Sequence, residues 1–535
     1  MTHPQAIAAA APDKVQIEDL LQRRWMRLLI PSFSDLFFLA ILVWVFAAGK
    51  FGWKGLLGDG DAGWHIRTGQ WILAHHAVPH RDLYSFSKAG APWYAWEWLS
   101  DVIYALLFGW AGLKAVVLMA AVVCAAFATI LIRRMAAGGT HILVALLVAL
   151  AGEGAASIHF LARPHIFTLL LISLSMWIIE ADRRNQTRWI WALIPIALVW
   201  TNLHGGFLAL IAVAGLTAAG SAAERRWRGA VRYAAVTCGC AAVSLVNPYG
   251  IQLHRHVEEY LRSDWIRNWI QEFQSPIFRG ESMLQFEALM FLGLIAAGMM
   301  FRRRQMVEGL WVLFFAHEAL SSVRHVPVFV AVCAPAIAAN LSDWYRGWTA
   351  RVKKNSLPGI LNQIAEDAAR GFRRGSVWPA VAVIVLAFLN RPIPWPQDFP
   401  EEIFPVKLVH DHPAEILNAR TLTTDQWADY LIFVNPNQKV FIDGRSDFYG
   451  REIGDSYLHM TGGRWDWEQI LDQFGFRSAL LPVEMPLAQL LKTDPKWQIV
   501  EDDGKAILFV RKAEVGERQT QAGLQDRTGG SPSAL

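Results

Sequence analysis

Long apolar segments separated by short polar connectors recur along most of this chain. A helix needs about 20 mainly apolar residues to cross the hydrocarbon core of a bilayer. Runs that approach this length predict eleven transmembrane helices, at 34–49, 114–132, 140–158, 165–181, 189–203, 207–223, 230–246, 286–301, 306–321, 325–341 and 377–390. The pattern therefore predicts an all-α polytopic membrane bundle over residues 34–390.

Basic residues concentrate in alternate connectors of this bundle. They include Arg133-Arg134, Arg183-Arg184, Arg225 to Arg228, Arg302 to Arg304 and Arg351 to Lys354. Because Lys and Arg favour cytoplasmic connectors, these connectors and the N-terminal tail, residues 1–33, are predicted to be cytoplasmic. The opposite connectors are rich in His, Pro, Gly and aromatic residues, and they are predicted to face outwards together with the C-terminus.

Leu99–Gly112 is a shorter apolar segment that does not fit this alternation. A full crossing would place Arg133-Arg134 and every later basic connector outside. We therefore interpret the segment as an interfacial or re-entrant helix that belongs to a large outer loop, residues 50–113. The alternative is a twelfth crossing.

Composition agrees with a membrane protein. The chain is 54% hydrophobic and 18% charged, whereas soluble domains carry about 25% charged residues. Its net charge of +4 gives no indication of a nucleic-acid partner. The four cysteines lie in apolar segments, which predicts that they are buried apolar residues and not disulfides of an outer domain.

The chain changes character at residue 391, where the proline-rich stretch RPIPWPQDFP disfavours helix. Residues 391–512 predict a small α/β domain outside the membrane. Its predicted elements are strands at Lys439–Ile442 and Ala506–Val510 and a helix at Trp465–Phe474. The polar residues 513–535 predict a disordered tail.

The outer loop contains the first candidate site. Asp59 and Asp61 flank Gly60, which would allow a sharp turn that brings both carboxylates to one space. One of them would act as a general base, or the pair would hold Mg²⁺ or Mn²⁺. The alternative is ordinary solvation at a turn. Candidate substrate-binding residues in the same loop are His65, Arg67 and Glu97.

Basic side chains in the other outer connectors form the second candidate site. Ten of the sixteen histidines lie in or beside outer connectors. Arginine pairs with phosphate through two parallel hydrogen bonds, and histidine donates one. The phosphate-binding candidates are Arg163, His165, Arg324 and His325, and His204 is a further candidate substrate-binding residue. Zinc is the alternative for clustered histidines, but the adjacent pair His75-His76 would face apart on a helix.

The stretch VFIDGRSDFYG at Val440–Gly450 places acids and a base after an apolar run. It is typical of a binding loop or of a structural salt-bridge turn. We favour the structural interpretation, since a single exposed ion pair contributes little energy.

The first apolar segment, followed by Asp59, Asp61, Trp64, His65, Gly69 and Ile72, resembles the GT-C superfamily of membrane glycosyltransferases. The nearest group is that of bacterial RgtA/B/C/D-type and aminoarabinose transferases. The resemblance implies a GT-C-like bundle in the bacterial inner membrane, with a periplasmic C-terminal domain. One element departs from the aminoarabinose transferases, because Ala91-Pro92-Trp93 stands where a Lys-Pro-Pro-like motif is expected.

This resemblance implies transfer of a sugar from a polyprenyl-phosphate donor to a lipid, glycan or protein acceptor, with Asp59 or Asp61 as base. Two rival functions stay open. A transporter or flippase of lipid-linked glycans would place polar groups through the midplane of several helices, whereas here they gather at one face. A catalytically silent envelope-assembly protein would keep the fold and dock a partner.

Overall fold

The computed structural model describes residues 26–48, 52–280, 282–372, 374–389 and 393–512. The predicted tail at 513–535 and most of the predicted tail at 1–33 lie outside these ranges. The chain forms two compact units. Among the described residues, the bundle unit contains 26–57, Leu107–Val257 and Arg267–Gln397, and the sheet unit contains Gly58–Leu106, Glu258–Ile266 and 398–512.

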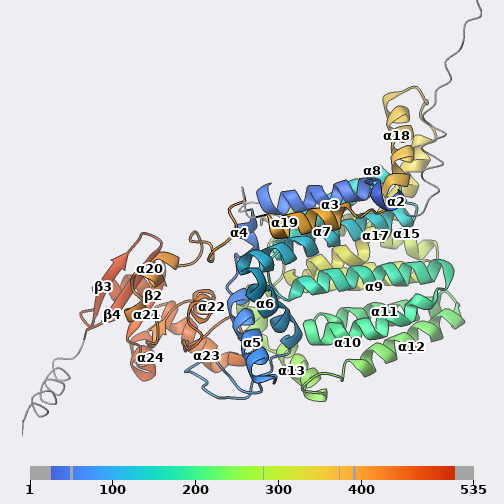
Figure 1. Ribbon diagram of the computed structural model, residues 1–535. Coiled ribbons are helices and arrows are strands. Elements are labelled where there is room, and N and C mark those ends of the chain that lie inside the picture. The colour runs from blue at the N-terminus through green and yellow to red at the C-terminus, as the bar shows by residue number, and fades with distance from the viewer. Residues whose placement is uncertain (1–25, 49–51, 281, 373, 390–392, 513–535) are drawn as a thin grey trace, which may run out of the picture. The chain divides into compact units, whose positions relative to one another are not determined.

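The bundle unit is helical throughout (Figure 1). Its α-helices are α2 (Met26–Leu29), α3 (Phe33–Val43), α4 (Trp53–Leu56), α7 (Leu113–Ala137), α8 (Ile142–Ala156), α9 (His165–Asn185), α10 (Leu193–Leu203), α11 (Phe207–Ala223), α12 (Trp227–Val243), α15 (Met283–Arg302), α16 (Met306–Ser321), α17 (Val326–Thr349), α18 (Leu357–Phe372) and α19 (Trp378–Phe388). Short turns are η1 (Trp44–Ala48), η2 (Ser157–His159), η3 (Arg188–Ala192), η4 (Gln271–Phe273) and η5 (Val323–His325). Three further helices, α6 (Trp98–Ala111), α13 (Ile251–Arg262) and α14 (Asp264–Trp269), have residues in both units.

All eleven predicted apolar segments are helical. In the described part of the chain, five helical stretches are long and apolar enough to cross a membrane, at Leu113–Ala137, Ile142–His159, His165–Asn185, Met283–Arg302 and Val323–Thr349. Five shorter apolar helices accompany them. The protein is a multi-pass integral membrane protein.

Small residues let the helices of the bundle approach closely. Gly220 of α11 leaves room for the backbone of Val307 in α16, whose Cα lies 2.6 Å from where a β-carbon on Gly220 would stand. Gly152 of α8 similarly faces Val330 of α17. Helices in lipid associate mainly through such close packing, because burial from lipid gives little hydrophobic gain.

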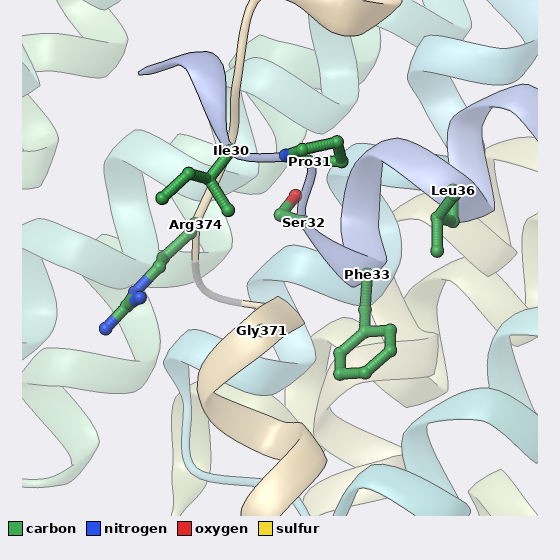
Figure 2. Close-up of a pocket in the computed structure, with 7 residues that line it drawn as sticks. All are labelled: Ile30, Pro31, Ser32, Phe33, Leu36, Gly371 and Arg374. Carbon is green, nitrogen blue, oxygen red and sulfur yellow. The ribbon is translucent and has the colours of Figure 1, made fainter. Parts of the chain in front are cut away.

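One end of α18 packs on the start of α3. The rings of Phe33 and Phe372 stack with their centroids 5.6 Å apart. Beside them lies a cavity of about 140 Å³, whose lining includes Ile30, Phe33, Gly371 and Arg374. Figure 2 shows Phe33 beside the last turn of α18, where Gly371 has no side chain to obstruct the ring.

The sheet unit contains a four-stranded sheet in the order β1-β2-β4-β3. Its strands are β1 (Thr421–Leu422), β2 (Ser478–Pro482), β3 (Trp497–Asp502) and β4 (Ala506–Arg511), and only the β1–β2 pair is parallel. The helices are α5 (Asp61–His75), α20 (Val406–Asp411), α21 (Pro413–Ile416), α22 (Asp425–Val434), α23 (Ser446–Thr461), α24 (Trp467–Phe474) and α25 (Pro486–Thr493). The predicted strand at Ala506–Val510 and the predicted helix ending at Phe474 are confirmed.

The predicted strand at Lys439–Ile442 is wrong. Val440 forms one isolated parallel bridge with Ser85, and the surrounding residues do not enter the sheet. The apolar run is buried because it packs against the outer loop: the Val440 amide donates to the Tyr84 carbonyl (2.8 Å), and the Phe86 amide donates to the Val440 carbonyl (2.9 Å). Residues 58–106 therefore fold together with the C-terminal region, and Trp64, Tyr84 and Trp93 share its hydrophobic core.

Candidate functional site

The two loop acids lie at the start of α5. Gly60 has right-handed helical dihedral angles, so the sharp turn expected there does not form. Asp59 Oδ1 instead accepts a hydrogen bond from the Asp61 amide (2.9 Å), which satisfies one of the amides left open at the start of a helix. Asp61 is the first helical residue and is buried, with 4% of its surface exposed.

Asp61 lies among carboxylates that its sequence neighbourhood does not contain. Asp61 Oδ1 and Asp429 Oδ2 both adjoin the space beside Gly444, where a β-carbon would clash with both oxygens. The Gly444 amide donates to Asp429 Oδ1 (3.1 Å). Burial, and then the charges of Asp61 and Asp443, raise the pKa of Asp429 well above its ordinary value. The Asp429 carboxyl accordingly holds its proton to higher pH than an isolated aspartate does.

Glycines bring α5 and α22 together at this cluster. A β-carbon on Gly60 would clash with the Gln426 carbonyl, and one on Gly63 would lie 2.7 Å from the Asp429 carbonyl. The Gly60 amide donates to Gln426 Oε1 (2.7 Å). Close backbone approach thus places Asp61 beside Asp429.

His65 lies one turn further along α5, between two acids of the same unit. Its Nδ1 is 2.5 Å from Asp101 Oδ1, and its Nε2 is 3.6 Å from Glu97 Oε2. His65 and Asp101 are almost fully buried, whereas the Glu97 side chain retains 12% exposure. Asp101 therefore fixes the orientation of the imidazole, whose other nitrogen lies near Glu97.

Arg67 is engaged by the end of α22. Its Nε donates to the Phe433 carbonyl (2.8 Å), its Nη2 donates to the same oxygen, and its guanidinium lies 5.2 Å from the Phe433 ring centroid. Nη1 donates to Gln70 Oε1 (2.8 Å). These contacts join α5 to α22.

The Asp443-Gly444-Arg445 turn is a buried ion-pair network. The Arg445 guanidinium bonds to Asp443 (2.6 Å) and to Asp82 of the outer loop (2.9 Å). It also lies 4.5 Å from the Trp93 ring centroid. Tyr449 donates its hydroxyl to Asp443 (2.7 Å). The geometry is that of the structural salt-bridge turn favoured from the sequence.

The phosphate-binding candidates lie in the bundle unit. The Arg163 guanidinium bonds to Glu272 Oε1 (2.5 Å), and the Arg324 guanidinium lies 4.4 Å above the centre of the Phe273 ring. Burial alone would raise the pKa of Glu272, but Arg163 and Arg324 hold it below its ordinary value. The structure therefore brings both arginines to one short segment, η4, although the three segments are far apart in the chain.

The candidate histidines surround these arginines. His165 Nε2 lies 2.7 Å from the His159 carbonyl, and its ring centroid is 6.5 Å from that of His204. His204 Nδ1 accepts from the Gly206 amide (2.9 Å). Desolvation, and then Arg324 and Arg163, lower the pKa of His204 to about 3, so this imidazole is neutral at physiological pH. His325 Nδ1 lies 3.2 Å from the Glu318 carbonyl.

Metal-binding geometry is not evident. Over the described ranges, no three His, Cys, Asp or Glu side chains converge to hold a metal ion. His75, of the pair considered for zinc, is exposed and stacks on Trp71 with centroids 4.2 Å apart.

Three acids of these sites were not identified from the sequence. Asp101 lies in the apolar α6, Asp429 lies in the C-terminal region, and Glu272 lies in a long connector. An acid inside an apolar helix is a functional signal in itself, and this criterion would have selected Asp101.

No family model matches the chain, and no curated protein sequence matches it. Solved structures do match. The archaeal oligosaccharyltransferase AglB from Archaeoglobus fulgidus, in complex with an inhibitory peptide and a dolichol-phosphate, is 12% identical with a TM-score of 0.52, over 91% of this chain and 74% of that chain. The apo form of the Archaeoglobus fulgidus oligosaccharyltransferase gives 11% identity and a TM-score of 0.50, over 86% and 70% of the two chains. The chain has a GT-C-like fold.

ArnT from Cupriavidus metallidurans in the apo state is also similar, at 13% identity and a TM-score of 0.49 over 89% of this chain and 97% of that chain. The helices, the four-stranded sheet and the similarity to AglB confirm the predicted fold class, a multi-span helical bundle followed by a small mixed α/β region.

Proposed function

We propose that this protein is a membrane glycosyltransferase that transfers a sugar from a polyprenyl-phosphate-linked donor to an envelope acceptor. The observation that carries the proposal is the similarity of the fold, over 91% of the chain, to an oligosaccharyltransferase solved with a dolichol-phosphate. The acceptor is a hydroxyl of a lipid, glycan or protein, on the outer face of the bacterial inner membrane.

Arg163 and Arg324 are proposed to bind the donor phosphate. Arg324 stacks on Phe273, and no carboxylate of the described residues lies within ion-pair distance of it, so its guanidinium is available to an anion. Glu272 orients Arg163 through their ion pair. Neutral His204, His165 and His325 supply hydrogen bonds without adding charge. Two fixed arginines suit a phosphate that gains charge as its bond to the sugar breaks.

Asp61 is proposed as the general base. Its carboxyl group is buried and adjoins that of Asp429 in the space beside Gly444, so it lies in a carboxylate pair shielded from bulk water. The acceptor hydroxyl gives its proton to Asp61, its oxygen forms the bond to the anomeric carbon, and the phosphate leaves with the electrons of the broken bond. This single displacement inverts the anomeric centre. Asp59 would hold the start of α5 in place through the Asp61 amide.

Mass spectrometry of envelope glycans and lipid-linked sugars tests the proposal. Cells would carry wild type, Asp59→Asn, Asp61→Asn or Arg324→Gln at matched expression. Glu484→Gln and Arg279→Gln, at exposed positions outside both sites, are the matched controls. We expect Asp61→Asn and Arg324→Gln to remove one sugar and to accumulate its polyprenyl-linked donor, with the controls unchanged.

The rival functions predict other results. A transporter of lipid-linked glycans would accumulate the complete glycan on the wrong side of the membrane after Arg324→Gln. If the protein only assists envelope assembly, deletion of the whole chain would produce a phenotype, whereas every point variant would behave as wild type. Either result would overturn the transferase.

A further inference from the structure

A cavity of about 770 Å³ opens in the bundle unit where α9, α11 and α12 meet, at the end of α9 opposite His165. The three helices lie side by side in Figure 1. The cavity lies at two of the basic connectors, Arg183-Arg184 and Arg225 to Arg228. Five arginines line it, at positions 183, 225, 226, 228 and 232, and Asp182 is the one acid in its lining.

Three of these arginines are neutralised by acids. Arg232 bonds to Asp182 (2.9 Å), and Arg183 bonds to Glu308 (2.9 Å). Arg226 lies 3.6 Å from a Glu224 oxygen.

The remaining two arginines have no acidic partner among the described residues. Arg225 and Arg228 are exposed, and no carboxylate of the described residues lies within ion-pair distance of either. The cavity therefore has an excess of positive charge. Guanidinium groups match the planar geometry of phosphate oxygens, so the charge fits a phosphate-bearing ligand.

The backbone adds to this preference. Trp227, Arg228 and Gly229 are the first three residues of α12, and all three line the cavity. The helix has no side-chain N-cap hydrogen bond. The first amides of a helix together carry about half a positive charge, which an anion can satisfy.

The rim of the cavity is apolar. Trp191 and Trp227 line it with 45% and 66% of their surfaces exposed, and Val231, which also lines it, is 70% exposed. Tryptophan gathers at the level of lipid headgroups, where one side of the ring meets hydrocarbon. A soluble anion would make no favourable contact with such a rim. An amphiphile with a phosphate headgroup would bind both the positive charge of the cavity and its apolar rim.

We propose that this cavity binds the headgroup of an anionic phospholipid from the membrane leaflet on the side of the basic connectors. Basic pockets between transmembrane helices are the setting in which such headgroups are held. The phosphate accepts from Arg225, Arg228 and the amides at the start of α12, and the acyl chains lie against Trp227 and Val231. This proposal does not depend on glycosyl transfer.

The test measures bound lipid by native mass spectrometry. Protein depleted of lipid in detergent would be mixed with phosphatidylglycerol or phosphatidylcholine. The test variant is Arg225→Asn with Arg228→Gln. The control is Arg304→Asn with Arg302→Gln, at a basic connector that does not line the cavity. Arg225 and Arg304 both have left-handed backbone (φ 62° and 59°), which asparagine tolerates, so the two double variants are matched in charge and in strain.

We expect wild type and control to retain phosphatidylglycerol over phosphatidylcholine, and the test variant to lose roughly 30-fold in phosphatidylglycerol binding, as for two arginines at an anionic surface. Equal retention of both lipids by wild type would overturn the proposal, as would equal losses in the two double variants. Inorganic phosphate, added as a competitor, should displace the lipid only weakly. Full displacement would assign the cavity to a soluble anion instead. A thermal melt of each variant checks that it is folded.

Discussion

Arg445 joins the outer loop to the C-terminal region through a buried ion-pair network. It is buried between Asp443 and Asp82. We predict that Arg445→Met destabilises the protein by about 3–5 kcal/mol, because the substitution leaves two buried carboxylates without their counter-charge. Arg451→Met, at an exposed position, should change stability by no more than about 0.5 kcal/mol. Thermal unfolding of purified protein in detergent measures both, and equal melting of the two variants would contradict the prediction.

His204 should make stability depend on pH. Its pKa in the folded protein is about 3, below the ordinary value of 6.5. The folded state therefore binds this proton less well than the unfolded state does, so the stabilisation is complete above pH 6.5 and is lost as pH falls toward 3. We predict that His204→Gln flattens the decline of the unfolding temperature between neutral and mildly acidic pH. His75→Gln, at an exposed histidine, serves as control. A decline as steep in His204→Gln as in wild type would show that other groups cause it.

At the level of residues, the sequence predicted which chemistry is present but not which partners it has. The loop acids are predicted because a carboxylate at the membrane edge is costly, and His65, Arg163 and Arg324 because imidazole and guanidinium groups in outer connectors suit phosphate. Their partners Asp429, Asp101 and Glu272 come from other segments. Such pairs form only in the tertiary fold, and the spacing of residues within one segment does not predict them.

The contact between α5 and α6 depends on Gly69. A β-carbon there would overlap the Asp101 carbonyl and lie 2.7 Å from Ala105. We predict that Gly69→Ala forces the two helices apart, lengthens the His65–Asp101 contact and lowers the unfolding temperature. Gly109→Ala is the control, because nothing lies within 4 Å of its β-carbon position. Replacing glycine by alanine in an unobstructed helix favours stability by about 0.5–1 kcal/mol. A Gly69→Ala protein that melts like wild type would refute the close contact.

At the level of elements, the helices were predictable, whereas of the two predicted strands only Ala506–Val510 is confirmed. The eleven predicted apolar segments correspond to eleven helical regions, because each run is long enough for its length to distinguish a helix from a strand. The run at Lys439–Ile442 has the composition of a strand, yet its partner is Ser85 in the outer loop, and composition cannot identify a partner. The two-residue strand β1 is too short to leave a pattern. Helix α5 lies within the segment that the sequence predicts as a large outer loop, residues 50–113.

At the level of the whole molecule, folding of the outer loop with the C-terminal region constrains the membrane topology. Residues 58–106 and 398–512 form one compact unit, so both lie on the same side of the membrane. The chain between them must cross an even number of times. Ten predicted segments follow α6, and an additional crossing by α6 would make the number odd. The length of α6 does not decide whether it crosses the membrane, because α6 spans about 21 Å and the predicted crossing helix α19 only about 17 Å.

Labelling of single cysteines tests this count. In a Cys238→Ser background, which removes the exposed native cysteine, one cysteine would replace Ala77, Lys354 or Glu484, all of which are exposed. A membrane-impermeant maleimide added to intact cells and to inverted vesicles reports the side of each. We predict that Ala77→Cys and Glu484→Cys react from outside and that Lys354→Cys reacts only from the cytoplasmic side, because α19 lies between Lys354 and Glu484. Opposite sides for Ala77→Cys and Glu484→Cys would mean that α6 crosses, and then the outer loop and the C-terminal region could not share one core.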